Sequence, residues 1–465
     1  MTSRQHPPSS GSHLSRALKR AAGILALFLL VCALVPPLVH KTVTEPVPIT
    51  GSPGERVAAV DSNREAMLWR LRLIRSAQES LILSTFDLRP DETGLDILAA
   101  LQEAADRGVR IQILADGICG AMYLQASAHF RALAAMPNVE ARFYNPINLL
   151  KPWALNYRMH DKYLIVDNHA YLLGGRNTYD LFLREDLGHY NIDRDVLVYV
   201  PEGGGSLEAL RAYFDSIWSL GENRVLSPSQ SDRVETAREA LRQRAGKLEH
   251  KYPKAFCPID YPSETIPARA VSLLANPPHP GNKEPLVWDA LCKLMQQGEQ
   301  VRIQTPYIIC GRAMYRDLAE VCAQVQSLRI MTNAPEGGAN PFGCADFLNQ
   351  KGKLLRLGTE TLEWLGGQSL HTKTVLIDDH LSVVGSFNMD MRSAYLDTEL
   401  MVVIDCPQLN KQLRESFDVM SESSRISTLE GDYLGQQCPK PGMPPARQLL
   451  YGILRILLWP VRHLL

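Results

Sequence analysis

Two segments of the chain place a histidine, a lysine and an aspartate at the same spacing, HxKxxxxD. Their motif residues are His160, Lys162 and Asp167 in the first copy and His371, Lys373 and Asp378 in the second. In an extended strand the side chains at positions i and i+2 lie on one face, so each His and Lys should point to the same place. Each segment therefore predicts a cluster of one imidazole and one fixed cation, and the six motif residues form the candidate catalytic set.

The match between the two copies continues beyond the aspartate without an insertion. Gly174 corresponds to Gly385, and Asn177 corresponds to Asn388. A single HxK pair is usually an ordinary core or surface pair, but similarity extended in this way indicates an internal duplication. The copies differ at one useful place, where Gly175-Arg176 stands opposite Ser386-Phe387, and Arg176 would add charge to the site if it points inward. Ser386 is the second difference at this place. We expect its hydroxyl to add a phosphate donor, which would make the two ends of the site unequal.

Two such clusters, brought together, would suit the cleavage of a phosphodiester. One imidazole can attack phosphorus while the other protonates the leaving oxygen. The two lysines, with the amides of Asn177 and Asn388, can hold the non-bridging oxygens as negative charge develops. This chemistry requires no metal, and no two cysteines stand in a CxxC spacing, so we expect neither a metal site nor another cofactor.

The elements around the motifs follow the same order in both halves of the chain. In the first half a helical pattern over 94–107 separates short apolar strands over 81–86 and 109–114. In the second half a helical pattern over 314–324 separates strands over 301–309 and 327–333. Strands that alternate with helices of this length indicate βαβ units. We therefore predict an α/β protein with two similar lobes, each a mixed, mostly parallel sheet flanked by helices.

An apolar stretch near the N-terminus predicts a membrane anchor. Residues 21–39 carry no charge, and Arg16, Lys19 and Arg20 precede them. That length suits a transmembrane helix, although Pro36 and Pro37 would distort its last turn. Positive charge on the leading side predicts a single pass with the N-terminus inside and the catalytic lobes outside the cytoplasm. A cleaved signal peptide is the alternative, because the core before the prolines is short.

The charge balance and the C-terminal tail point toward lipid. The formal net charge is −1, whereas a dedicated nucleic-acid binder usually has a basic excess, so we expect no nucleic-acid partner. The tail over 447–465 mixes Leu and Ile with three Arg and one His, which suits an amphipathic helix at a membrane surface. A helix docked on the protein is the alternative interpretation of this tail.

The segments MHDKYLIVDNHAYLLGGRN and LHTKTVLIDDHLSVVGSFNMDMRS resemble the paired motifs of the phospholipase D superfamily. Within it the chain is most similar to the bacterial cardiolipin synthase group, over roughly Arg56 to Ser424. The resemblance implies two phospholipase D-like lobes and a covalent phosphohistidine intermediate. It implies His160 as the nucleophile and His371 as the general acid, with the lysines and asparagines on the phosphate. Asp167 and Asp378 would hold the scaffold.

The resemblance also implies that a later acidic residue in each half orients a catalytic histidine and fixes its tautomer. Glu399 fits this role in the second half. Asp195 fits it in the first half, with Asp193 in reserve.

These features divide the chain into seven predicted regions. They are a basic leader (1–20), the anchor (21–39), a spacer (40–55), the first phospholipase D-like lobe (56–225), a linker with a charged helix (226–270), the second lobe (271–425) and the tail with its membrane-surface helix (426–465).

Three enzymatic functions are compatible with this reading. The first is a phosphatidyltransferase that makes cardiolipin, with phosphatidylglycerol and, as a second candidate, phosphatidylethanolamine as phospholipid substrates. The second is a hydrolase of the same class that releases phosphatidic acid, and the third is an anchored nuclease. A binding protein on an inactive duplicated fold is disfavoured, because both motifs are intact.

Overall fold

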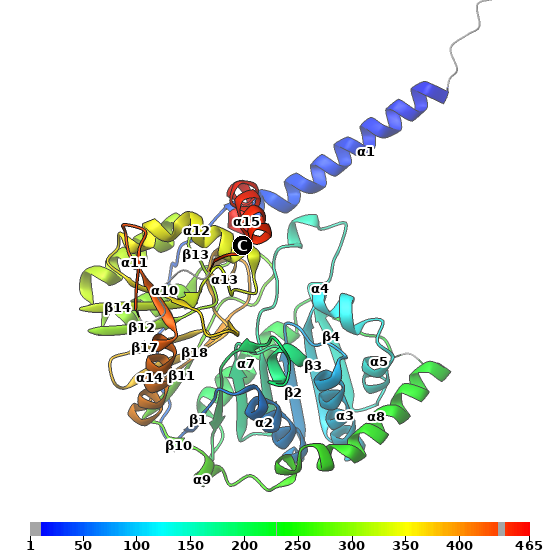
Figure 1. Cartoon of the computed structure of the whole chain (residues 1–465). Helices are drawn as coiled ribbons and strands as arrows, with labels where there is room; N and C mark the ends of the chain where they lie inside the picture. Colours follow the sequence, from blue (N-terminus) through cyan, green and yellow to red (C-terminus); the bar gives the residue numbers. More distant parts are fainter. Residues whose placement is uncertain (1–10, 229, 436–441) are drawn as a thin grey trace, which may run out of the picture.

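The structure of the chain is a computed structural model, which describes residues 11–228, 230–435 and 442–465. Two lobes, each built on a nine-stranded sheet, lie side by side (Figure 1). The first sheet has the order β10 (Ile266–Pro267), β1 (Arg56–Val60), β8 (Asp195–Tyr199), β6 (Ala170–Gly174), β5 (Tyr163–Val166), β2 (Ser80–Thr85), β3 (Arg110–Asp116), β4 (Val139–Tyr144) and β9 (Arg224–Val225).

The second sheet repeats the eight strands from β1 to β9 in the same order, but it has no counterpart of β10 and carries β22 (Tyr433–Leu434) at its other edge. Its order is β11 (Ala270–Ala275), β20 (Leu400–Asp405), β18 (Leu381–Gly385), β17 (Thr374–Ile377), β12 (Gln300–Gln304), β14 (Ser327–Asn333), β15 (Glu360–Trp364), β21 (Ser424–Ser427) and β22 (Tyr433–Leu434). The motif strands β5 and β17 therefore occupy equivalent central positions, which is what an internal duplication predicts.

The sheets are mixed, but the prediction that they are mostly parallel is wrong. Parallel pairing is confined to β2–β3–β4 in the first sheet and β12–β14–β15 in the second. The motif strands are antiparallel to both of their neighbours. The reason is local: Asp167 and Asp378 adopt positive φ values of 44° and 51°, so each motif strand turns back directly into a hairpin.

Helices flank both sheets. Those of the first lobe are α2 (Asn63–Ser76), α3 (Glu92–Asp106), α4 (Gly117–Cys119), α5 (Ala128–Ala134), α6 (Asp180–Leu183), α7 (Gly205–Trp218), α8 (Asp232–Lys251) and α9 (Tyr261–Glu264). Those of the second lobe are α10 (Leu286–Gln296), α11 (Arg312–Gln324), α12 (Pro341–Leu355), α13 (Met391–Tyr395) and α14 (Pro407–Glu422). Local chemistry sets their ends: Asp91 caps the first turn of α3, and Gly108, at φ 96°, follows its last.

A shared apolar core joins the two lobes. One buried cluster combines Ile165 and Val196 of the first sheet with Leu376 and Val402 of the second. Side chains of α7 and α14, among them Phe214, belong to the same cluster. Burial of apolar surface drives such packing, so the lobes form one body and hold their motif strands in a fixed relation.

The charged helix predicted within a linker packs instead on the first lobe. In Figure 1, α8 lies along the edge of this lobe beside α3 and α5. Leu241 and Leu248 enter the first core, and Arg244 pairs with Asp96 at 2.6 Å. The chain then passes from the first sheet to the second between β10 and β11.

The N-terminal helix α1 (Gly11–Leu34) projects away from both lobes (Figure 1). It ends five residues before the predicted limit at Val39, because Pro36 and Pro37 lack an amide hydrogen and form a separate turn over Pro36–Leu38. Within the described part of the chain, no helix has both the length and the apolar character needed to span a bilayer. The structure therefore does not support the predicted transmembrane anchor over 21–39. The first ten residues of the predicted leader lie outside the described residues.

The C-terminal tail forms α15 (Pro445–Leu457), which docks on α12 and lies near the end of α1 (Figure 1). Tyr451 donates a hydrogen bond to the Pro335 carbonyl at 2.9 Å, and Arg462 pairs with Asp346 at 2.8 Å. The opposite side of α15 exposes Leu449, Ile453 and Ile456. The helix is thus docked on the protein and keeps an exposed apolar face.

Candidate active site

The two motifs meet where the lobes exchange backbone contacts. β7 (Asn191–Ile192) of the first lobe pairs in parallel with β16 (Ser369–Leu370) of the second, directly before His371. The equivalent contact is a parallel bridge between Met159 and Thr398, directly before His160. The His371 N–H donates to the Ile192 carbonyl at 2.7 Å, and the His160 N–H donates to Thr398 Oγ1 at 3.1 Å. Each motif histidine is therefore anchored by the opposite lobe.

The acidic partners of the histidines are also exchanged between the lobes. His160 Nδ1 lies 3.0 Å from Glu399 Oε1, and His371 Nδ1 lies 2.5 Å from Asp193 Oδ2. Contact through Nδ1 leaves the Nε2 atom of each ring to act on a substrate. Each imidazole thus has the carboxyl partner that fixes its orientation and tautomer, as in other acid–His pairs.

Asp195 is not that partner, so its predicted orienting role is wrong. Asp195 lies two residues beyond Asp193 and pairs with Arg70 at 2.9 Å and Arg176 at 3.2 Å. The inter-lobe pairing of β7 brings Asp193, which directly follows Ile192, to His371, while Asp195 already belongs to the buried strand β8. Arg176 is fully buried and bonds to Asn63 and to the carbonyls of Phe182 and Asp193, so it does not reach a phosphate.

Each of the two motif lysines contacts the histidine of its own motif. Lys162 Nζ donates to the His160 carbonyl at 2.6 Å and lies 5.1 Å from the centre of the Phe86 ring. Lys373 Nζ bonds to the His371 carbonyl and also lies 2.6 Å from His371 Nδ1 and 3.2 Å from its Nε2. Both lysines are buried. The structure therefore brings two cations beside the two imidazoles, as the motif spacing predicted.

The two asparagines are also buried beside the motifs. Asn388 Nδ2 donates to the Tyr307 hydroxyl at 3.2 Å. The side-chain oxygens of Asn177 and Asn388 are both buried without a hydrogen-bond partner among the described residues. Buried amide groups are normally bonded on both sides, so each of these keeps an unpaired acceptor oxygen that a hydroxyl of a ligand could bond.

Ser386 does not face a phosphate and supports Glu399 instead. Its hydroxyl donates to Glu399 Oε2, and the Leu400 N–H donates to Ser386 Oγ at 3.0 Å. Its predicted role as a phosphate donor is therefore wrong. At the equivalent Gly175, a Cβ atom would stand 2.6 Å from Asp193 Oδ1 and 3.0 Å from Lys373 Cδ. Glycine is needed there because the orienting acid and the lysine occupy the space of a side chain.

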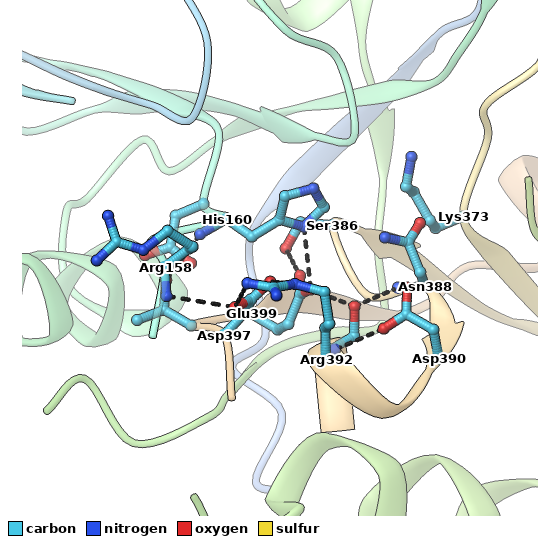
Figure 2. Close-up of polar contacts among 12 residues, drawn as sticks. Arg158, His160, Lys373, Ser386, Asn388, Asp390, Arg392, Asp397 and Glu399 are labelled. Atoms are coloured by element: carbon cyan, nitrogen blue, oxygen red, sulfur yellow. Dashed lines mark hydrogen bonds and ion pairs between the residues drawn. The ribbon is translucent and has the colours of Figure 1, made fainter. Parts of the chain in front are cut away.

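Glu399 lies in a polar network of the second lobe (Figure 2). Ser393 Oγ donates to Glu399 Oε1 at 2.6 Å. Behind it Arg392 pairs with Asp397 at 3.0 Å, and Asp397 accepts from the Arg158 N–H at 3.3 Å. The sequence analysis missed Ser393 and Asp397, although their closeness to Glu399 in a segment rich in polar residues could have indicated them.

Asp167 and Asp378 lie at the far ends of the motif strands and do not contact the histidines. Asp167 accepts three backbone N–H bonds, from Gln78, Glu79 and Ser80, at 2.8–2.9 Å. Asp378 accepts from Glu299 and Gln300 at 2.8 Å. Both carboxylates tie the motif turn to the start of the neighbouring strand. Their contacts are those of scaffold residues, so Asp167 and Asp378 do not belong in the candidate catalytic set.

Burial and neighbouring charges make the two His–acid pairs electrostatically unequal. Burial lowers the pKa of His160 well below its usual value and, together with Lys373, lowers the pKa of His371 to about 3. Burial also raises the pKa of Glu399 to about 8. Burial would raise the pKa of Asp193 as well, but the charges of Lys373 and His371 hold it at about 2. Asp193 is thus the stronger anion and is better suited to support a protonated imidazole.

Comparisons with known proteins agree with this geometry. The model of a family described as "Cardiolipin synthase, PLD-like domain" matches residues 71–218 and 291–421, which together are more than half of the chain. An uncharacterized protein of Helicobacter pylori is 25% identical over 405 residues, covering 77% of this chain and 78% of that protein. Cardiolipin synthase C of Escherichia coli K12 is 26% identical over 408 residues, covering 77% of this chain and 83% of that protein.

A solved structure supports the same fold. The crystal structure of phosphatidylserine synthase from Haemophilus influenzae Rd KW20 matches with a TM-score of 0.62 at 17% identity. The match covers 89% of this chain and 97% of that chain. With its duplicated motifs and crossed His–acid pairs, the chain belongs to the cardiolipin synthase family with phospholipase D-like domains.

Proposed function

We propose that this enzyme is a phosphatidyltransferase that joins two phospholipids to make cardiolipin through a phosphohistidine on His160. The observation that carries the proposal is the pairing of two histidines, each held by an acid of the opposite lobe, above two buried lysines. The family and the relatives named as cardiolipin synthases supply the substrate class.

In the first step His160 Nε2 attacks the phosphorus of phosphatidylglycerol, and a P–N bond forms as the P–O bond to the glycerol headgroup breaks. The leaving oxygen takes the proton from His371 Nε2, so free glycerol departs. In the second step His371 removes the proton from the hydroxyl of another phosphatidylglycerol, whose oxygen attacks phosphorus and displaces His160. The lysines and Asn177 and Asn388 hold the non-bridging oxygens in both steps.

The asymmetry of the acids favours this order of roles. The general acid must be an imidazolium before it gives up its proton. Burial and Lys373 lower the pKa of His371, whereas the ionised Asp193 beside it acts in the opposite direction and stabilises the protonated ring. The nucleophile must remain neutral, and His160 lies beside Glu399, whose raised pKa reduces the negative charge there. His371 is therefore assigned as the acid and base, and His160 as the nucleophile.

Exposed apolar side chains support a substrate drawn from a membrane. The loop between β4 and β5 leads into His160, and its Leu149 and Leu150 are 78% and 85% exposed. Asn156, on the same loop, donates to the Ala33 carbonyl near the end of α1. Exposed apolar side chains on a loop that leads into the site fit contact with lipid better than contact with nucleic acid.

The purified protein should form cardiolipin and release glycerol in vesicles of phosphatidylglycerol, as resolved by mass spectrometry. Phosphatidic acid as the sole lipid product would support the hydrolase instead of the transferase. Degradation of single-stranded DNA without lipid turnover would support the nuclease. Replacing phosphatidylglycerol with phosphatidylethanolamine as the phosphatidyl source tests the second donor candidate.

The value of kcat/KM should begin to fall at a lower pH than an enzyme with ordinary lysines would show. Burial lowers the pKa of Lys162 to about 7 and that of Lys373 to about 8. As pH rises through these values the free enzyme loses the cations that bind phosphate, so kcat/KM should fall above about pH 7 to 8 rather than near the ordinary lysine pKa of about 10.4. A pH series of initial rates at low lipid fraction measures this. A flat profile up to pH 10 would contradict it.

A further inference from the structure

A second polar cluster, built around an arginine, lies beside the motif of the first lobe and has no part in the mechanism described above. This Arg89 cluster consists of Asp87, Arg89, Tyr123 and Tyr179. Arg89 forms an ion pair with the buried Asp87, in which its Nε and Nη2 atoms lie 2.6–3.2 Å from the carboxylate oxygens. Its guanidinium carbon lies 3.8 Å from the centre of the Tyr179 ring and 4.6 Å from that of Tyr123. The guanidinium is thus fixed by a carboxylate and two aromatic rings.

Backbone and ring contacts connect the cluster to the reacting groups. Leu88 bridges in parallel to Thr178, the residue after Asn177, and the Arg89 N–H donates to the Thr178 carbonyl. Phe86, directly before Asp87, packs edge-on against His160 with ring centres 5.0 Å apart.

On the other side, Phe182 packs against His371 at 4.9 Å and against Tyr179 at 5.1 Å. Arg89 is therefore linked to His371 through two rings, Tyr179 and Phe182, and lies three residues along the chain from Phe86, which packs on His160.

The cluster also has unused hydrogen-bond donors that reach solvent. The Arg89 side chain is 34% exposed, and only its Nε and Nη2 atoms bond to Asp87. Across the described ranges, Arg89 Nη1 and the hydroxyls of Tyr123 and Tyr179 make no hydrogen bond within the protein. A fixed guanidinium with a free edge beside two free hydroxyls matches the three acceptor oxygens of a phosphate group.

The second lobe has no such cluster at the equivalent place. Thr85 bonds to the Asp87 carbonyl as Thr305 bonds to the Tyr307 carbonyl, which makes Asp87 equivalent to Tyr307. The counterpart of Arg89 is then the buried Ile309. At this equivalent position, therefore, the first lobe carries a guanidinium and the second lobe an apolar side chain.

We infer that the Arg89 cluster binds the phosphodiester of the acceptor lipid and so selects an anionic phospholipid over water or a neutral alcohol. This inference rests on the proposed function. The phosphate of the donor lipid binds to the two lysines beside the histidines. The acceptor lipid has its own phosphate, which is separated from the attacking hydroxyl by only one glycerol and brings a second negative charge. Without a cation outside the first phosphate site, the two like charges would repel each other. Arg89 supplies that cation.

The test separates the acceptor from the donor step. Vesicles contain phosphatidylglycerol diluted in phosphatidylcholine, and labelled glycerol is added to the solution. Incorporation of label into phosphatidylglycerol reports transfer to an uncharged acceptor, whereas cardiolipin reports transfer to an anionic one. Both products share the same donor step, so their ratio isolates recognition of the acceptor and does not depend on the folded fraction of a variant.

Arg89→Gln should lower the ratio of cardiolipin to labelled phosphatidylglycerol about tenfold, since one charge-assisted hydrogen bond is lost. Arg89→Lys should lower it less. Tyr123→Phe, which leaves the ion pair with Asp87 intact, should lower it about twofold to threefold. The matched control is Arg142→Gln. Arg142 also pairs with a carboxylate two residues earlier, Glu140, and also stacks on an aromatic ring, Trp218 at 4.2 Å, but none of these residues contacts either motif histidine.

The outcomes separate this inference from the function on which it rests. An unchanged ratio in Arg89→Gln and Tyr123→Phe, with cardiolipin still formed, overturns the inference alone. An equal fall of the ratio in Arg142→Gln also overturns it. A wild type that makes no cardiolipin overturns the proposed function, and this inference with it.

Discussion

Changing His371 to glutamine should stop turnover of phosphatidylglycerol but leave the enzyme able to form its covalent intermediate once. Loss of a general acid costs about 10²- to 10⁴-fold in rate, because glycerol is a poor leaving group without a proton. A phosphatidyl ester of p-nitrophenol needs no such proton. With this substrate His371→Gln should release one equivalent of p-nitrophenol rapidly and then stall, since no base activates the acceptor.

The stalled enzyme should carry the phosphatidyl group on His160, as mass spectrometry of a digest prepared at neutral or basic pH would show. His160→Gln should give neither the burst nor the adduct, because it lacks the nucleophile. Thermal unfolding of both variants near the wild-type temperature serves as the folding control. The opposite pattern, with an adduct on His371 in the His160 variant, would reverse the roles assigned to the two residues.

Much of this site could be predicted from the sequence because the motif is local. The spacing of His160, Lys162 and Asp167 fixes a strand, a buried lysine and a turn within one hairpin, and the second copy repeats it. The structure places each lysine against the histidine of its own motif, as the spacing predicts. The charged carboxylate at the end of the motif has a local explanation as well, since Asp167 bonds to the backbone at the start of β2.

The orienting acids could not be assigned in the same way. Asp193 and Asp195 are two residues apart, so alternation along a strand gives them the same face and cannot separate them. The choice depends on the pairing of β7 with β16 across the lobes, which no local pattern encodes. The prediction that the sheets are mostly parallel was wrong for a related reason. The βαβ units predicted the parallel strands correctly, but the hairpin that follows each motif adds antiparallel strands on the other side.

The crossed arrangement gives the second large prediction. Asp193→Asn should lower kcat by about 10³- to 10⁴-fold, because an asparagine amide cannot hold the proton on His371 Nδ1 or stabilise the imidazolium. The fold should persist, since the asparagine oxygen can still accept the Arg194 N–H, which lies 2.8 Å from Asp193 Oδ1. The measurement is kcat on phosphatidylglycerol together with the burst on the p-nitrophenyl ester.

A position-specific readout distinguishes orientation from stability. Asp193→Asn should retain the burst, because the acid is not needed for that leaving group, whereas Glu399→Gln should weaken it by disturbing the nucleophile. Asp195→Asn is the matched control two residues away. It leaves Arg70 and Arg176 buried without their carboxylate, so it should lower the free energy of unfolding by roughly 3 to 5 kcal/mol. The Asp195 variant molecules that remain folded should still catalyse. If Asp195→Asn abolished kcat in the folded fraction while Asp193→Asn did not, the pairing of Asp193 with His371 would have no role in the reaction.

The exchange of acids between lobes also explains the duplication. Neither lobe supplies the acid for its own histidine, so we expect one lobe alone to offer the motif without the carboxyl partner that orients the imidazole.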